Sequence, residues 1–192
     1  MRTPDFWRLA ILAFCACLSG NAFADDGAKS DARRAEIRQT AVATLEQLYF
    51  VQPKARLAID EAAGYAVFSN FGMKIGVAGG GSGRGIVVDR ASGRETFMKM
   101  AEVQAGLGLR VKKYRQVWLF ERRADLQRFI DSGWEMSGQS TASAQLAGRG
   151  GELHSGALSL RSGVWLYQLS DSGLALDITA KGTRYYRDKK LN

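Results

Sequence analysis

The sequence contains few of the residues that build catalytic and metal sites: it has two cysteines and one histidine among 192 residues. Cys15 and Cys17 both lie near the N-terminus, so a chain that loses this segment can form neither a disulfide nor a thiolate metal site. His154 is the single histidine, and carboxylates such as Asp60 and Glu61 lack the spacing of metal ligands. We therefore expect a non-enzymatic protein without metal or cofactor.

The N-terminus has the pattern of a secretory signal peptide. Arg2 and Arg8 precede an apolar run, residues 9–18, which is followed by Ala22-Phe23-Ala24, an A-x-A cleavage site. The run is shorter than the roughly 20 apolar residues that cross a bilayer as a helix. The pattern predicts a signal peptide over residues 1–24 and an exported protein of the periplasm or cell envelope.

A lipid anchor is the alternative at this end of the chain. Residues 14–17, Phe-Cys-Ala-Cys, resemble a bacterial lipobox and would place the lipid on Cys17. In either case residues 25–192 are long enough for one domain with a real core and short for two.

Positive charge exceeds negative charge along the chain. The formal net charge is +8, and removal of Arg2, Arg8 and Asp5 with the signal peptide lowers it only to +7. This excess favours anionic partners, of which phospholipid headgroups are the first choice for an exported protein. The alternative is that the positive charge serves only to keep the protein soluble. The positive charge would also suit binding to nucleic acid, but the sequence contains no nucleic-acid recognition motif.

Helical periodicity comes first and strand periodicity follows. Ser30 or Asp31 can cap a helix with Ile37, Ala41, Leu45 and Leu48 on one face, and Pro53 suits the first turn of a second, short helix. From residue 65 the period becomes two. Strands are predicted at 65–68, 86–88, 107–111 and 117–120, one helix at 124–131, and a final hairpin of 164–169 with 174–186. Turn signals at 89–93 and 170–173 favour antiparallel pairing. The predicted class is α+β, with N-terminal helices before a largely antiparallel, glycine-rich β-sheet that has one interposed helix.

The glycine run at 77–89, VAGGGSGRGIVVD, matches no nucleotide or hydrolase motif. It departs from G-x-G-x-x-G, lacks the lysine of a Walker loop, and misses the G-x-S-x-G elbow around Ser82, whose only available base would be His154. We interpret its glycines as structural, allowing strands to bend or approach a neighbour closely. A ligand groove lined by backbone is the alternative. The structural set is Gly76, Gly79, Gly80, Gly81, Gly83 and Gly85.

Several separate motifs together resemble the SYLF domain family. They are Gly64-Tyr65-Ala66-Val67-Phe68, Lys74-Ile75-Gly76, the glycine run, Gly85-Ile86-Val87-Val88, Gln104-Ala105-Gly106-Leu107-Gly108 and Gly133-Trp134-Glu135, in the family's order, within about residues 35–147. Ser69 stands where the family usually has proline. The resemblance implies a mixed α+β domain that binds phospholipids. The actin activity of eukaryotic members is not expected of an exported protein.

Binding of anionic headgroups requires clustered cations that hydrogen-bond phosphate. The candidate lipid-binding residues are Lys74, Arg84, Arg110, Lys112, Lys113, Arg115, Arg184 and Arg187. The expected function is peripheral binding of anionic phospholipids at a membrane surface. The alternative is a structural or protein-interaction domain of the cell envelope with no specific lipid ligand.

Overall fold

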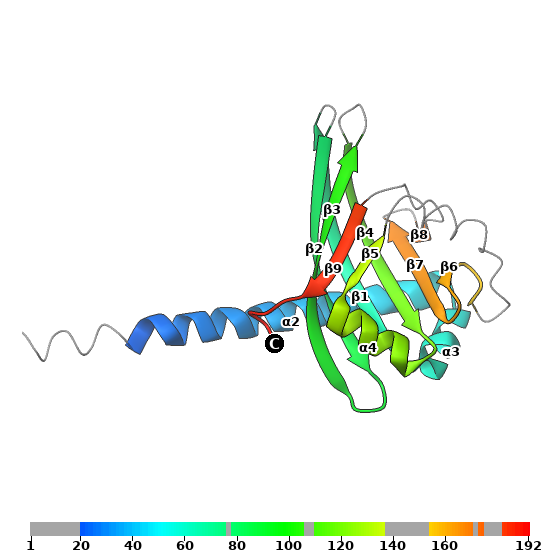
Figure 1. Ribbon diagram of the computed structural model, residues 1–192, viewed down its shortest axis with the longest axis horizontal. Helices are drawn as coiled ribbons and strands as arrows, with labels where there is room; N and C mark the ends of the chain where they lie inside the picture. Colours follow the sequence, from blue (N-terminus) through cyan, green and yellow to red (C-terminus); the bar gives the residue numbers. More distant parts are fainter. Residues whose placement is uncertain (1–19, 76–77, 106–109, 137–153, 171–172, 175–181) are drawn as a thin grey trace, which may run out of the picture. The chain divides into compact units, whose positions relative to one another are not determined.

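A computed structural model describes residues 20–75, 78–105, 110–136, 154–170, 173–174 and 182–192 (Figure 1). Predictions for Gly76, for residues 107–109 and for most of 174–181 lie outside this part. The chain forms two compact units, residues 1–36 and 37–192. None of the described helices is long and apolar enough to cross a membrane.

The first helix, α2 (Gly20–Val51), begins ten residues before the predicted cap at Ser30. Ala22, Ala24 and Ala28 favour helix upstream of Ser30, but Asp25, Asp26 and Gly27 do not, so neither local propensity nor the cap signal at Ser30 predicts this helix start. In the first unit, Arg34 pairs with Asp31 at 2.6 Å, one turn away on the helix surface.

The second unit combines helices with one antiparallel sheet, so the α+β class is confirmed. Among the described residues the sheet has nine strands, in the order β5-β9-β3-β2-β1-β4-β7-β6, with β8 paired to β7. After residues 37–51 of α2, the elements are α3 (Lys54–Glu61), β1 (Gly64–Ile75), β2 (Ala78–Asp89), β3 (Arg94–Ala105), β4 (Arg110–Phe120), α4 (Arg123–Ser132), β5 (Trp134–Met136), β6 (Leu158–Arg161), β7 (Val164–Ser170), β8 (Gly173–Leu174) and β9 (Gly182–Arg187).

The turn signal at 89–93 is confirmed by the β2–β3 hairpin. Asp89 accepts the Gly93 amide at 2.8 Å through its backbone oxygen, and Gly93 has a φ of 67°. The predicted final hairpin is wrong for β9. This strand pairs with β3 and β5, whereas β7 pairs with β4, β6 and the short β8. Strand periodicity identifies strands but not their partners, which here lie at opposite edges of the sheet.

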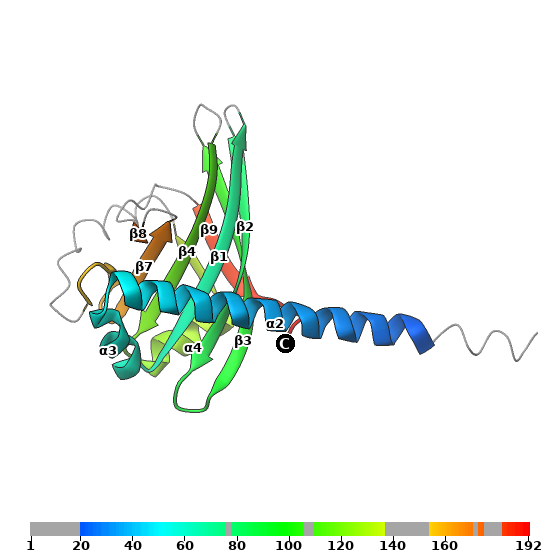
Figure 2. The same ribbon diagram turned by 180° about the vertical axis from the view of Figure 1, so that it is seen from behind.

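Each face of the sheet carries its own hydrophobic core. Residues 37–51 of α2, together with α3, pack on one side, and α4 packs on the other (Figures 1 and 2). Ala66, Phe68 and Trp118 belong to the α4 core, whereas the alternate positions Val67 and Val117 belong to the α2 core. We call these sides the α4 face and the α2 face.

The sheet curls around the α4 face. Trp118 of β4 and Tyr185 of β9 have ring centroids 5.0 Å apart, although three strands separate β4 from β9 in the sheet order. Trp118 is fully buried, while Trp134 is partly buried and packs against the same core.

Glycines of β2 leave room for this curl. A Cβ at Gly83 would lie 2.5 Å from the Ser69 backbone oxygen and 2.6 Å from Met100 Cγ. One at Gly85 would collide with the Val67 oxygen and the Phe68 ring. At Gly80 the nearest atom is the Glu102 oxygen at an ordinary 3.5 Å. Two glycines of the run therefore sit where no side chain fits.

Candidate functional site

Strand alternation brings cationic side chains together on the α2 face, beside the helix. Arg115 marks this face, because its guanidinium donates to Gln47 Oε1 of α2 at 2.7 Å. Phe97 also marks it, since Arg38 of α2 lies over the Phe97 ring. The positions that share this face on β2, β3, β4 and β9 include Arg84, Lys99, Lys113, Arg115 and Arg184. We call these five residues the cationic patch.

The pairing register arranges the patch in two rows across the sheet. In the first row Lys99 stands opposite Arg84, Arg84 opposite Ser69, and Ser69 opposite Arg115. At a strand spacing of about 4.8 Å, this row spans roughly 15 Å. The second row, one pleat further along the strands, runs from Arg184 of β9 to Lys113 of β4. The half-strands that carry both rows extend beyond α2 toward the strand ends (Figure 2).

Most side chains of the cationic patch are exposed, and ion pairs neutralise only part of its positive charge. Arg84, Lys113 and Arg184 are exposed, and Lys99 and Arg115 are half-buried. Within the described residues, Arg84 and Arg184 form no ion pair. The patch thus displays cations that are available to an anionic ligand.

The acidic residues near the patch are fewer than its cations. Lys99 Nζ lies 3.1 Å from Asp188 Oδ1, and Glu95 pairs with Arg38 of α2 at 2.7 Å. Glu135 of β5 is the register partner of Arg184. These carboxylates neutralise part of the charge at two edges of the face and leave Arg84, at its centre, unopposed.

The structure separates the predicted lipid-binding residues into three groups. Arg84, Lys113, Arg115 and Arg184 share the α2 face. Arg187 does not, because alternation along β9 turns it to the α4 side, where it pairs with Asp131 at 3.2 Å. Lys74 and Arg110 are register partners on β1 and β4, and Lys112 is opposite Gly72, but the side chains of these three residues lie outside the described part.

Sequence reasoning missed Lys99. It lies in β3, far along the chain from the glycine run, and it joins Arg84 only through the β2–β3 register. The Asp89–Gly93 turn signal fixes that register, so counting outward from the turn would have placed Lys99 opposite Arg84.

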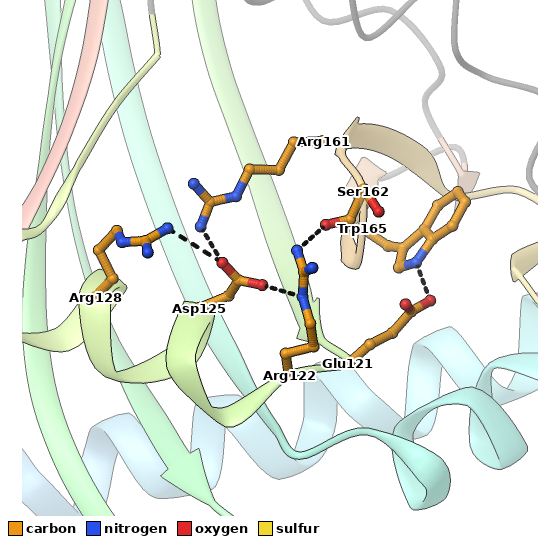
Figure 3. Close-up of polar contacts among 7 residues, drawn as sticks. All are labelled: Glu121, Arg122, Asp125, Arg128, Arg161, Ser162 and Trp165. Atoms are coloured by element: carbon orange, nitrogen blue, oxygen red, sulfur yellow. Dashed lines mark hydrogen bonds and ion pairs between the residues drawn. The ribbon is translucent and has the colours of Figure 1, made fainter.

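Arginines around α4 are held by the buried carboxylate of Asp125 (Figure 3). Asp125 accepts from Arg122 Nε at 2.8 Å, from Arg161 Nη2 at 2.7 Å, and more distantly from Arg128 Nη1 at 3.4 Å. Arg161 also lies over the Trp134 ring, 4.5 Å from its centroid. These guanidiniums are held around a shared acceptor, which ties α4 to β6.

A second carboxylate, Asp89, ties α4 to the β2–β3 turn. Arg123 donates to its Oδ2 from Nε at 3.2 Å and from Nη2 at 3.0 Å. Burial favours the neutral carboxyl, but the hydrogen bonds from Arg123 and from the amides of Ser92 and Ala91, with the Arg123 charge, hold the pKa of Asp89 below its ordinary value. Asp89 therefore stays ionised at neutral pH.

Polar side chains also cluster inside the curl of the α4 face. Glu102 accepts hydrogen bonds from Asn70 Nδ2 at 2.7 Å and from the Tyr114 hydroxyl, and Tyr185 donates to Gln116 Oε1 at 2.6 Å. Burial, as the largest cause, raises the pKa of both tyrosines, so their hydroxyls remain donors at any physiological pH. The cluster is buried, and its hydrogen bonds connect β1, β3, β4 and β9.

Ser82 and His154, the pair weighed as a hydrolase site, have different surroundings. His154 Nε2 lies 3.1 Å from Glu121 Oε1, and its ring stacks on Trp165 at 4.2 Å. Ser82 is exposed on the α2 face of β2. In the described part of the chain no group of three His, Cys, Asp or Glu residues is placed to hold a metal ion.

Comparison with known proteins gives one informative similarity. No family model matches the sequence. The chain is 34% identical over 160 residues to Beta cell expansion factor A of Aeromonas veronii, and this match covers 82% of the chain. The chain spans only 58% of the length of that relative.

Proposed function

We propose that this protein is a non-catalytic, exported domain of the SYLF type, and that its cationic patch binds anionic phospholipid headgroups at a membrane surface. The observation that carries the proposal is the row of Lys99, Arg84 and Arg115 across neighbouring strands of one face. Guanidinium and ammonium groups donate charge-assisted hydrogen bonds to phosphate oxygens. Neighbouring donors in such a row can bind neighbouring headgroups at a membrane surface.

The size of the patch suits reversible adhesion. A cation near an anionic membrane contributes about 1 kcal/mol, an attraction that falls off within a Debye length. Five cations, partly opposed by Asp188 and Glu135, then supply a few kcal/mol. The relative from Aeromonas veronii has a name that refers to beta-cell expansion and specifies no ligand. A cell-envelope protein as partner remains the alternative, and it would use the same charges.

Vesicle co-sedimentation tests the proposal. The double variant Arg84→Gln, Arg184→Gln removes two patch cations. The matched variant Arg94→Gln, Arg187→Gln removes the same charge from positions off the α2 face. We expect wild type and the matched variant to pellet with vesicles of phosphatidylglycerol and phosphatidylcholine at low salt, and the patch variant to pellet several-fold less.

Raising the salt concentration should release the wild type and have less effect on the patch variant. Equal pelleting with pure phosphatidylcholine, or equal losses in the two variants, would contradict the proposal. Recovery of a stoichiometric protein partner in place of lipid would support the alternative.

A further inference from the structure

The large apolar side chains that the protein exposes are concentrated on the side of the cationic patch. Among the described residues they are Val42, Phe50, Val51, Leu57, Val103 and Tyr186. Phe50 is 86% exposed, Val103 70% and Leu57 58%. All six belong to α2, to α3, or to α2-face positions of β3 and β9.

Helical geometry directs the outer side of α2 away from the sheet. Ile37, Ala41, Thr44 and Leu48 are buried and lie within a narrow arc of the helix. At 100° per residue, the opposite arc holds Gln39, Val42, Ala43, Glu46 and Phe50. Only Glu46 in that set is charged. An exposed helix surface normally carries charged and polar residues, yet three of these five, Val42, Ala43 and Phe50, are apolar.

The stripe projects further from the sheet than the patch does. A helix with its side chains is about 10 Å across, so the outer side of α2 stands roughly that far above the strands on which it packs. Arg84 and Lys113 belong to β2 and β4, so their side chains start from the level of the strands, below the outer side of the helix. A flat bilayer that reaches these cations must also touch the outer side of α2.

The α2–α3 corner continues the apolar stripe. Phe50 and Val51 end α2, Pro53 begins the next turn, and Leu57 is exposed on α3. Lys54 and Arg56 precede Leu57 in the sequence and are exposed. Arg56 also lies over the Tyr49 ring at 4.4 Å from its centroid. Apolar side chains beside cations are the composition of a surface that enters the headgroup region of anionic membranes.

From this geometry we infer that the outer stripe of α2 and the α2–α3 corner form a membrane-penetrating edge. Phe50, Val42 and Leu57 enter the interface of an anionic bilayer while the cationic patch contacts its headgroups. This inference rests on the proposed function and adds to it an orientation and a partly salt-resistant, hydrophobic component. The α4 face then points away from the membrane.

Site-specific labelling tests the orientation. Because both cysteines lie in the predicted signal peptide, an engineered cysteine in the chain without this segment is the single site for a thiol-reactive label. An environment-sensitive nitrobenzoxadiazole label on Phe50→Cys should shift its emission to the blue on vesicles of phosphatidylglycerol and phosphatidylcholine. The same label on Ser132→Cys, exposed at the end of α4, should not shift.

Substitution of the apolar residues gives a second readout. Replacing Phe50, Val42 and Leu57 by serine should lower vesicle partitioning about tenfold or more and abolish the binding that persists at high salt. Removing the charge with Glu46→Gln should strengthen partitioning. Circular dichroism checks that each variant is folded.

Three results would overturn the inference. One is an unshifted Phe50→Cys label although the wild type pellets with anionic vesicles and the Arg84→Gln, Arg184→Gln variant does not; the proposed function would then stand alone. Another is equal shifts at both labelled positions. The third is a dimer in analytical ultracentrifugation that the serine substitutions dissociate while vesicle binding is unchanged, which would assign the stripe to a second copy of the chain. Failure of the wild type to bind any anionic vesicle would remove the proposed function as well.

Discussion

The rings of Phe68 and Tyr185 meet edge-to-face with centroids 4.9 Å apart, although two strands, β2 and β3, separate their own strands β1 and β9. Side chains on nearby strands would ordinarily fill the space between them. Here β2 contributes glycine, because Gly85 is the register partner of Phe68. The aromatic core of the α4 face therefore depends on an absence of side chains on β2.

We expect Gly85→Ala to destabilise the protein. Its Cβ would collide with the Phe68 ring and with the backbone oxygen of Val67, which cannot move aside cheaply. Overpacking of this kind costs about 2 kcal/mol or more. Gly80→Ala is the matched control, because its Cβ would make only ordinary van der Waals contact. It should change the free energy of unfolding by no more than about 0.5 kcal/mol. Urea denaturation followed by tryptophan fluorescence measures both, and equal effects would refute this account of the glycines.

We expect the link between Arg123 and Asp89 to stabilise the fold in a pH-dependent way. Because the pKa of Asp89 is lowered in the folded state, its contribution is present above the ordinary carboxyl pKa of about 4 and is lost as the pH falls through the lowered value. Arg123→Gln removes the guanidinium and moves the pKa of Asp89 back up.

The free energy of unfolding of Arg123→Gln should therefore fall by about 1 kcal/mol at neutral pH and match wild type in strong acid. Denaturant titrations at a series of pH values measure this. A deficit that persists unchanged into strong acid would show that Arg123 acts through packing and not through the Asp89 charge.

Loss of the Asp125 carboxylate should be more costly than loss of an exposed one. Asp125→Ala removes the carboxylate that Arg122 and Arg161 share, and because the Arg122 side chain is 59% exposed and stays solvated, the loss should cost about 2 kcal/mol, the scale of a charge-assisted hydrogen bond. Asp131→Ala, also on α4, removes an exposed partner of Arg187 and should cost less than about 1 kcal/mol. Thermal unfolding by calorimetry compares them. Similar melting temperatures for the two variants would mean that water solvates Arg122, Arg128 and Arg161 as well as Asp125 does.

Local patterns were enough to predict much of the fold. The apolar spacing of Leu126, Phe129 and Ile130 predicted residues 124–131 as a helix, and α4 covers 123–132. The turn at Asp89 gave the β2–β3 hairpin. The predicted final hairpin was wrong because β9 completes the sheet beside β3, and periodicity carries no information on such long-range pairing.

The candidate site was predicted only in part, for the same reason. Arg84, Lys113, Arg115 and Arg184 were chosen as cations, but their common face depends on strand order, which only the structure supplies. Arg187 was chosen with them, but it is one residue out of phase with the α2-face positions of β9 and so belongs to the other face. Phe50 was not chosen as a site residue because the helix was predicted from its buried apolar positions. The small number of charged residues on its outer side was not considered.

The glycines of β2 also bear on how the chain finds its register while folding. Positions 79, 81, 83 and 85 share one face and are all glycine, so sliding β2 by two residues against β1 would keep glycine in front of most of the same neighbours. Glycine side chains on that half of the strand give little resistance to slippage against β1. The alignment with β1 then depends on the other end of β2, where Ile86 and Val87 lie opposite Val67 and Ala66. The tight connection after Asp89 fixes β2 against β3 instead, so the β2–β3 hairpin can close outward from that turn.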